Sequence, residues 1–350
     1  MGMGAFLPGG MAATLHILPF RDVELACKHM LALFPQAPSV PRLSLSVRMY
    51  MDGLPCLVVD KAKRRLLFDL ERTEELARFY QACLDDDLDH FALDPRHAPG
   101  FYRLLEMLAA APPPGLALVH LELPGPVTWG LSLVDSRSGR AGWYDATMRE
   151  VLVKALSMKA RWQEREVQRV LPGVGAMVTL GEPSLGMVQS AYGSMSAEEV
   201  VANLSEVLAG VQGLRCVHCC SNMDWSLLMK AGVGVINFDA FQYADKLALY
   251  ASPLREYLER GGLLAWGIVP VNPDRLAGED QASLLRRLEE ALAIVARAVG
   301  RGVYYLVQRA FITPCCTPST LSETEALRAW ELTGILSRDI AARHLAAPAP

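Results

Sequence analysis

Hydrophobic and polar positions in the second half of the chain alternate between two periods. Short, nearly continuous apolar runs predict buried strands at 214–218, 234–238, 263–270 and 310–313. Between these runs, apolar residues at helical spacing predict helices over 196–211 and 282–299. The first of these helices opens with a capping box formed by Ser196 and Glu199. The pattern is therefore one of repeated strand–helix units.

The same alternation continues upstream. It predicts strands at 116–122 and 176–180, with a long helix over 148–171 between them. Repeated units with apolar strands indicate a parallel sheet covered by helices. About eight strands can be counted, and no Gly-x-Gly-x-x-Gly fingerprint follows the first, so we expect an α/β fold of the (β/α)8 TIM-barrel type. The part 43–60 predicts a pair of strands that turn at Asp52-Gly53, a small N-terminal elaboration.

Composition narrows the class of protein. The 350 residues are 51% hydrophobic and 21% charged, which excludes a disordered chain. A net charge of -4 gives no excess of positive charge that would attract nucleic acid or an anionic membrane surface. No apolar run reaches the roughly 18 residues that a membrane-spanning helix needs. The start lacks the features of a signal peptide, so we expect a cytoplasmic protein. We expect a frayed start at 1–12, one barrel domain over 13–345 and a tail at 346–350.

Two cysteine clusters each follow a predicted strand: His218-Cys219-Cys220 and Cys315-Cys316. A His-x-Cys pair with one distant Cys provides the three ligands of an open, catalytic type of zinc site. The alternative is that these cysteines are small buried hydrophobic residues. Cys219 and Cys315 would point away from the ligands on an extended chain, so we expect them to be packing residues, with an exchange of ligands as the alternative.

A series of short motifs runs through the chain in a fixed order. They are Ala13-Thr14 with Leu18-Pro19, Gly125-Pro126-Val127-Thr128, Glu182-Pro183-Ser184-Leu185, the segment 217–225, Phe238-Asp239-Ala240, the segment 264–270 and Ile312-Thr313-Pro314-Cys315-Cys316. In this order they resemble the catalytic barrel of cobalamin-independent methionine synthase. More broadly, the chain is similar to the superfamily that also contains uroporphyrinogen decarboxylase and the zinc methyltransferases that use corrinoid proteins.

The resemblance implies a zinc site and a reaction. Carried over to this chain, the zinc ligands are His218, Cys220, Asp239 and Cys316, and Glu182 is a candidate contact to a substrate amine. The alternatives are that Asp239 is a helix cap or an exposed loop acid and that Glu182 caps the next segment. Zinc lowers the pKa of a bound thiol, which then attacks a methyl group as the thiolate. The donor would be a methylated folate or methylcobalamin.

The departures from the family concern the substrate. The Ile-Gly-Ser segment that holds the homocysteine carboxylate is absent from 14–18, and the Asp that contacts its ammonium is Gly181. The family's proton-donating His corresponds to Asn272, and an amide is no useful general acid for a folate leaving group. We therefore expect a methylated corrinoid, or a corrinoid protein, as the donor and a small-molecule thiol as the acceptor.

Zinc-dependent methyl transfer to a thiol is thus the predicted activity, and two alternatives stay open. One is a non-catalytic relative that binds a metal or a corrinoid as an accessory protein. The other is an enzyme similar to uroporphyrinogen decarboxylase, which would need several arginines at the pocket, whereas only Arg21 lies near the first predicted strand end. His16 and His120 lie on candidate strands near the expected barrel mouth, without a partner spacing that demands a function.

Overall fold

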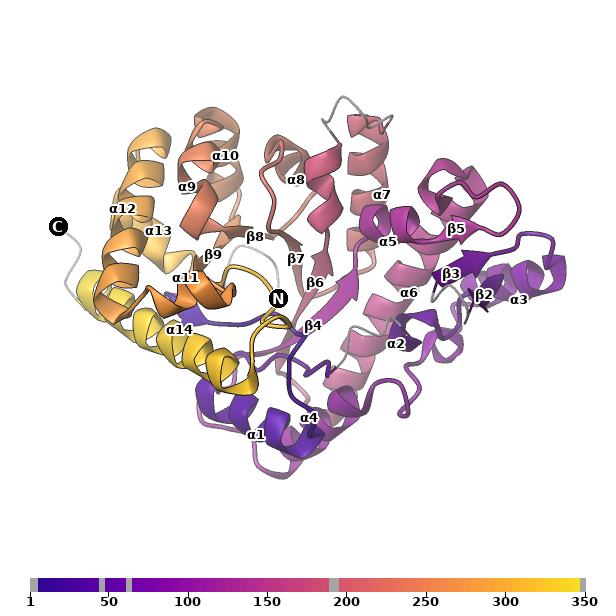
Figure 1. Ribbon diagram of the computed structural model, residues 1–350, viewed down its shortest axis with the longest axis horizontal. Coiled ribbons are helices and arrows are strands. Elements are labelled where there is room, and N and C mark those ends of the chain that lie inside the picture. Colours follow the sequence, from indigo (N-terminus) through magenta and orange to yellow (C-terminus); the bar gives the residue numbers. More distant parts are fainter. Residues whose placement is uncertain (1–5, 44–47, 61–64, 189–194, 347–350) are drawn as a thin grey trace.

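A single parallel sheet forms the centre of the molecule (Figure 1). The structure is a computed structural model that describes residues 6–43, 48–60, 65–188 and 195–346. The sheet has seven strands in the order β1-β10-β9-β8-β7-β6-β4, and every pairing in it is parallel. These strands are β1 (Met11–Ala12), β4 (Leu118–Pro124), β6 (Gly175–Gly181), β7 (Leu214–Cys219), β8 (Val235–Asp239), β9 (Leu263–Val269) and β10 (Ala310–Pro314).

The segment 38–42 connects the two ends of this sheet. Ser39 pairs with His120 of β4, and Arg42 pairs with Ile17 beyond β1, both in parallel. Two backbone bonds join Val40 and His120, and Leu18 and Arg42, at 3.0 and 2.8 Å. The sheet therefore curls round to meet itself, which confirms the predicted TIM-barrel-type fold.

Helices surround the barrel, and the strands they cover are buried along their length. All residues of β8, β9 and β10 are buried, which explains why these strands are nearly continuous apolar runs in the sequence. The helices are α1 (Val23–Leu33), α2 (Arg48–Met51), α3 (Thr73–Leu84), α4 (Pro99–Ala110), α5 (Pro126–Ser132), α6 (Ala146–Val170), α7 (Ala197–Ala209), α8 (Ser226–Lys230), α9 (Ala240–Ala248), α10 (Ala251–Glu259), α11 (Pro273–Ala277), α12 (Gln281–Val299), α13 (Val303–Gln308) and α14 (Glu323–His344). Short 3-10 helices lie at Leu88–Phe91, Gly142–Tyr144 and Pro183–Met187.

The predicted strands and helices of the barrel are confirmed to within about two residues at each end, as expected for element boundaries. The N-terminal boundary was wrong. Of the segment expected to be frayed, the described part 6–12 is tied to the barrel, because β1 pairs with β10 and the ring of Phe6 stacks on that of Phe311. Most of the expected C-terminal tail lies outside the described residues.

The N-terminal elaboration differs from the expected strand pair. Residues 44–47 lie outside the description, and the next four residues form helix α2. The small sheet contains instead β2 (Leu57–Asp60), β3 (Arg65–Phe68) and β5 (Val134–Asp135), in that order. Figure 1 shows it beside α3, on the side of the molecule away from α12 and α14. The strands begin later because the apolar residues before the turn pack as a helix against the barrel.

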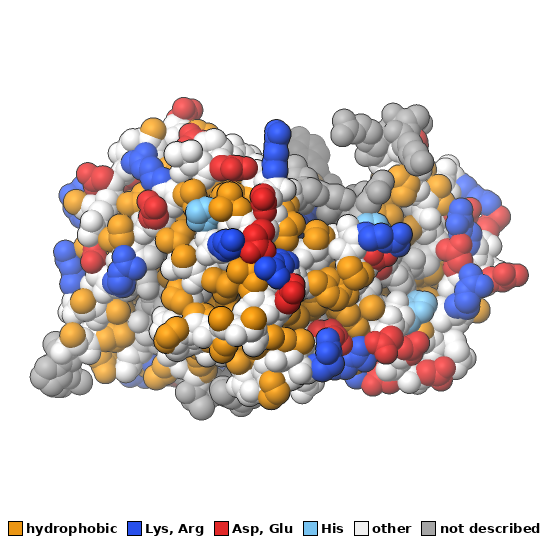
Figure 2. Space-filling view, turned by 90° about the horizontal axis from the view of Figure 1, so that it is seen from below, with side chains coloured by type: hydrophobic (Ala, Val, Ile, Leu, Met, Phe, Trp, Pro, Cys, Tyr) orange, Lys and Arg blue, Asp and Glu red, His pale blue; other side chains and the backbone are white. Residues whose placement is uncertain are grey.

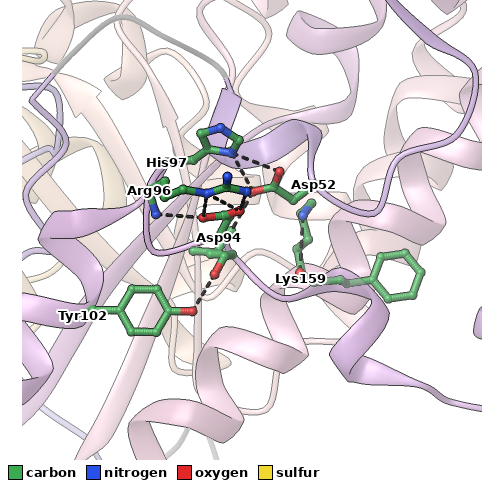
Figure 3. Close-up of polar contacts among 8 residues, drawn as sticks. Asp52, Asp94, Arg96, His97, Tyr102 and Lys159 are labelled. Atoms are coloured by element: carbon green, nitrogen blue, oxygen red, sulfur yellow. Dashed lines mark hydrogen bonds and ion pairs between the residues drawn. The ribbon is translucent and has the colours of Figure 1, made fainter.

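The predicted turn at Asp52-Gly53 is present in the structure, and a cluster of polar contacts stabilises it (Figure 3). Gly53 has a φ of 76°, and a Cβ there would lie 2.5 Å from a backbone carbonyl oxygen, so glycine is required. The Asp52 carboxylate accepts hydrogen bonds from the Asp94 backbone and from His97 Nδ1, both at 3.1 Å. Below them the buried Lys159 of α6 donates to a backbone carbonyl oxygen at 3.3 Å. This cluster fixes the elaboration to the outside of the barrel.

On the face seen in Figure 2, basic and acidic side chains are interspersed with hydrophobic ones, both near its centre and at its rim. None of the described helices combines the length and the apolar character that crossing a membrane requires.

Candidate metal centre

Three of the four predicted ligands come together at the carboxyl ends of the strands. His218 lies in β7, Cys220 directly follows that strand, and Cys316 lies two residues beyond β10. Among the described residues, one ligand atom from each forms a group in which all atoms lie within 4.8 Å of one another. In a TIM barrel the carboxyl ends of the strands form the face that carries the active site, and the group lies on this face.

The neighbouring strand fixes the orientation of the imidazole. Asn237 of β8 donates from Nδ2 to the Thr313 hydroxyl at 3.0 Å and to the Ala265 carbonyl at 3.2 Å, so its Oδ1 can only accept. This oxygen accepts a hydrogen bond from His218 Nδ1. The proton is therefore on Nδ1, and Nε2 keeps a lone pair. Nε2 is buried and makes no hydrogen bond among the described residues.

The two thiols and the imidazole shift one another's pKa. The pKa of Cys316 is well below its ordinary value, chiefly because Cys220 donates a hydrogen bond to its sulfur and because His218 is close. The pKa of Cys220 is raised by the same contact. Burial lowers the pKa of His218, but the neighbouring Cys316 outweighs this effect and the net shift is upward. One thiolate is thus favoured without a metal, and a metal would have to displace the proton of the other thiol.

The adjacent cysteines point elsewhere. Cys219 donates its S–H to the Ser221 carbonyl oxygen at 3.6 Å, and Cys315 donates to that of Gly267 at 3.1 Å. Both side chains are buried, and burial raises the pKa of Cys219 to about 12. A protonated thiol that is bonded to a backbone carbonyl is a poor metal ligand.

Asp239 lies at the end of β8 but outside the group of three. Its carboxylate caps α9: it accepts hydrogen bonds from the Gln242 backbone at 3.0 Å and from the Gln242 amide group. Burial raises the pKa of Asp239. Ligation by Asp239 therefore stays a prediction, and it would require the carboxylate to give up part of this cap.

Glu182 and Asn272, the predicted catalytic residues, both cap helices. The Glu182 carboxylate is fully buried and accepts hydrogen bonds from the backbone of Val127 and Thr128, at 2.8 and 2.7 Å, in the first turn of α5. Its burial raises the pKa to about 7. Asn272 is exposed, and its Oδ1 accepts a hydrogen bond at 3.1 Å in the first turn of α11. Their roles in catalysis stay predictions.

Sequence reasoning missed Asn237 and Thr313, which hold the imidazole in place. A signal was present, because each is a single polar residue inside an otherwise apolar predicted strand. A polar group is retained at such a position only when it is hydrogen-bonded. The pattern marks the residue as unusual but does not reveal its partner.

A cavity lies at the other end of the barrel. It has a volume of about 370 Å³ and is lined by residues at the amino ends of β4, β6 and β7, together with Glu164. Both oxygens of Glu164 accept backbone hydrogen bonds, from Gln212 at 2.9 Å and from Gly213 at 2.7 Å. This carboxylate is a structural anchor, and the cavity is separate from the candidate metal centre.

The donor set fits a metal ion of the zinc type. One imidazole with a free lone pair and two thiols at mutual contact distance are the ligand types of zinc, and soft thiolates disfavour magnesium and calcium. The hydrogen bond from the other imidazole nitrogen to Asn237 is the outer support that metal-binding histidines ordinarily have. The fold and the site therefore define a (β/α)8 barrel with a candidate three-ligand metal centre at its carboxyl end.

Comparisons with known proteins agree with this fold. No protein-family profile matches the chain, and no curated protein matches it. The structure of a putative vitamin-B12 independent methionine synthase from Listeria monocytogenes aligns over 91% of this chain and 86% of its own, with a TM-score of 0.58 and 12% identity. A B12-independent methionine synthase from Shewanella sp. W3-18-1, solved in complex with selenomethionine, aligns with 17% identity and a TM-score of 0.47. This alignment covers 65% of this chain and 64% of the Shewanella chain, so this chain spans less than two thirds of that protein's length. The alignment with the Listeria structure confirms the resemblance to the methionine synthase barrel for the fold.

Proposed function

We propose that His218, Cys220 and Cys316 bind zinc and that the protein is a methyltransferase that activates a thiol acceptor at this ion. The observation that carries the proposal is the buried lone pair on His218 Nε2, held beside two thiols by the hydrogen bond from Nδ1 to Asn237. A buried nitrogen with no partner is costly unless a ligand completes it.

Each residue of the centre has a defined task in this proposal. Bound zinc would lower the pKa of an incoming thiol, so that the sulfur is a thiolate at neutral pH. Cys316 enters the site already biased toward the thiolate, and Cys220 gives up its proton when the metal binds. His218 would contribute no charge once a metal occupies Nε2, because Asn237 holds the remaining proton of the ring on Nδ1.

The donor we propose is a methylated corrinoid. In this reaction the acceptor sulfur forms a bond to the methyl carbon, while the electron pair of the cobalt–carbon bond stays on cobalt, so no general acid is needed. Asn272 supports this choice, because it is exposed, carries no ionisable group and uses its oxygen to cap α11. Folate as the donor would require a proton at the leaving nitrogen.

The first test is metal content, with matched cysteine variants. Cys220→Ser and Cys316→Ser should lose most of about one zinc per chain, whereas Cys219→Ser and Cys315→Ser should keep it, because these neighbours donate to carbonyl oxygens. Zinc is measured by elemental analysis after exhaustive dialysis. Equal zinc in all four variants, or no zinc in the wild type, would refute the proposed centre.

The second test is turnover. Anaerobic incubation of the zinc-loaded protein with methylcobalamin and a panel of thiols should give methylated thiol and demethylated corrinoid in equal amounts. Zinc binding without turnover would favour the accessory protein among the alternatives, since Glu182 and Asn272 are both engaged in helix caps.

A further inference from the structure

The end of β8 carries the predicted metal ligand that lies outside the group of three. Asp239 directly precedes α9, and Gln242 follows it three residues later, which is the spacing of a capping box. Asp239 Oδ1 accepts a hydrogen bond from the Gln242 backbone at 3.0 Å, and Oδ2 accepts one from the Gln242 side-chain amide. Both oxygens of this buried carboxylate are therefore used by the first turn of the helix.

The first turn of α9 depends on its cap more than an ordinary helix end does. Tyr243 has a φ of -126° and a ψ of 16°, so a kink separates this turn from the rest of the helix. The backbone N–H groups of the turn therefore rely on the Asp239 carboxylate for an acceptor. Phe241, within the turn, lies under the guanidinium of Arg287 on α12, which is 4.1 Å from the ring centre. A displaced Asp239 would release a turn that packs against a neighbouring helix.

The charge of the metal group leaves little for a further anion to gain. Cys220 and Cys316 as thiolates would balance the two positive charges of a zinc ion, and His218 would add no charge. In its present place, the Asp239 carboxylate meets the positive end of the α9 dipole and accepts two hydrogen bonds. A move to the metal would exchange these contacts for an ion that is already neutralised.

We propose that Asp239 remains the cap of α9 when a metal is bound, so that three side chains hold the metal and one coordination position stays open for the acceptor sulfur. This assignment differs from the four-ligand set that the resemblance implies. It rests on the proposed function, because it needs a metal at His218, Cys220 and Cys316. Three protein ligands and one open position are the usual arrangement of catalytic zinc. The acceptor thiol can then bind without displacing a side chain of the protein.

The test compares Asp239→Asn with Asp239→Ala, with zinc affinity measured by chelator competition and stability by thermal unfolding. Asparagine caps a helix about as well as aspartate does, so Asp239→Asn should keep zinc affinity within about threefold and unfold near the wild-type temperature. Asp239→Ala should unfold at a lower temperature, because the first turn loses its cap. Its zinc affinity should also stay within about threefold, because the cap is lost from the metal-free and metal-bound forms alike.

Asp145 provides the matched control, because it is the N-cap of another helix. Its carboxylate accepts a hydrogen bond from the Met148 backbone at 2.9 Å in the first turn of α6. Asp145→Ala should lower the unfolding temperature and leave zinc affinity unchanged, which shows how far the loss of a cap alone affects the metal. If Asp239→Ala does not fold, Asp239→Asn still decides, because it keeps the cap.

The cobalt-substituted protein gives a second readout, since its visible absorption reports the ligands of the ion. Asp239→Asn should have the wild-type spectrum and should show the same spectral change when 2-mercaptoethanol is added. A loss of zinc affinity beyond about threefold in Asp239→Asn, an altered cobalt spectrum, or no response of the wild type to the thiol would overturn this inference and leave the metal site standing. Absence of metal binding by the wild type would overturn the proposed function and this inference with it.

Discussion

Replacing Asn237 by Leu tests whether metal binding by His218 at the candidate metal centre depends on the hydrogen bond to this neighbour. The substitution removes the oxygen that accepts the proton of His218 Nδ1 and keeps the volume of the side chain similar. Without a metal, the imidazole can move its proton to Nε2, where it faces Cys316. A metal bound at Nε2 forces the proton back to Nδ1, where the variant has no acceptor.

The size of the effect follows from this difference. A buried donor without a partner costs about 1–3 kcal/mol, and in the variant this cost arises only in the metal-bound state. At about 1.4 kcal/mol for each factor of ten, zinc affinity should fall by roughly 5- to 150-fold. Loss of an outer-shell partner of a metal-bound histidine typically costs about 10- to 100-fold, which agrees.

The assay is competition for zinc with a chelator of known affinity at fixed pH, with thermal unfolding as a check on the fold. Thr313→Val is the matched control. It removes one acceptor of the Asn237 amide but leaves the oxygen that His218 uses, and Ala265 still orients the amide, so affinity should stay within about threefold. Wild-type affinity in Asn237→Leu, or an equal loss in Thr313→Val, would refute the tautomer argument.

Two further predictions concern stability. The pKa of Lys159 is lowered from 10.5 to about 8 by burial, so the unfolded chain binds more protons between pH 8 and 10.5, and stability rises with pH across that window. Lys159→Met should therefore stabilise the protein at pH 7 by about 2 kcal/mol, that is, about 3 kcal/mol from the pKa shift less about 1 kcal/mol for the lost hydrogen bond to Phe91. This gain should shrink above pH 8. Urea unfolding at pH 7 and 9.5 measures the gain, and a variant that is less stable than wild type at pH 7 would contradict the prediction. Gly125→Ala should lower the free energy of unfolding by about 1–3 kcal/mol or more, because the new Cβ would lie 2.1 Å from the buried Glu182 side chain. The control is Gly302→Ala, whose Cβ would have nothing within 4 Å and which should change the free energy of unfolding by less than about 0.5 kcal/mol. Equal midpoints of urea unfolding for the two variants would contradict the packing argument.

The barrel was predictable because its strands are buried on both sides. A strand such as β9, which is buried at every position, must be apolar throughout, and such runs stand out between amphipathic helices. The N-terminal elaboration was not predictable in the same way. The residues before Asp52-Gly53 are apolar enough for a strand or a helix, and tertiary packing against the barrel decides for α2. Similarly, β1 has only two residues, too few to give a pattern.

The candidate metal centre was predictable as a set of residue types but not as a geometry. His218, Cys220 and Cys316 carry their chemistry in the side chain, and their positions after strands place them on one face of a barrel. Asp239 likewise has a side chain that can bind a metal and lies at the end of a predicted strand, yet its carboxylate caps α9. Whether an acid at a strand end turns inward or caps the next helix depends on a rotation of one side chain, which no sequence pattern encodes.

The three buried histidines of the barrel show why hydrogen-bond accounting separates structural from functional groups. All three follow or lie in predicted strands, and only His218 has the His-x-Cys spacing that predicts a metal ligand. His120 has both nitrogens bonded to hydroxyls, so a ligand would gain nothing there. His16 and His218 share a different arrangement: a fixed acceptor holds Nδ1–H, and Nε2 is left buried with a free lone pair. Because an unmet buried nitrogen costs stability, the free lone pair on Nε2 separates His218, a candidate ligand, from His120, whose hydrogen bonds are all made.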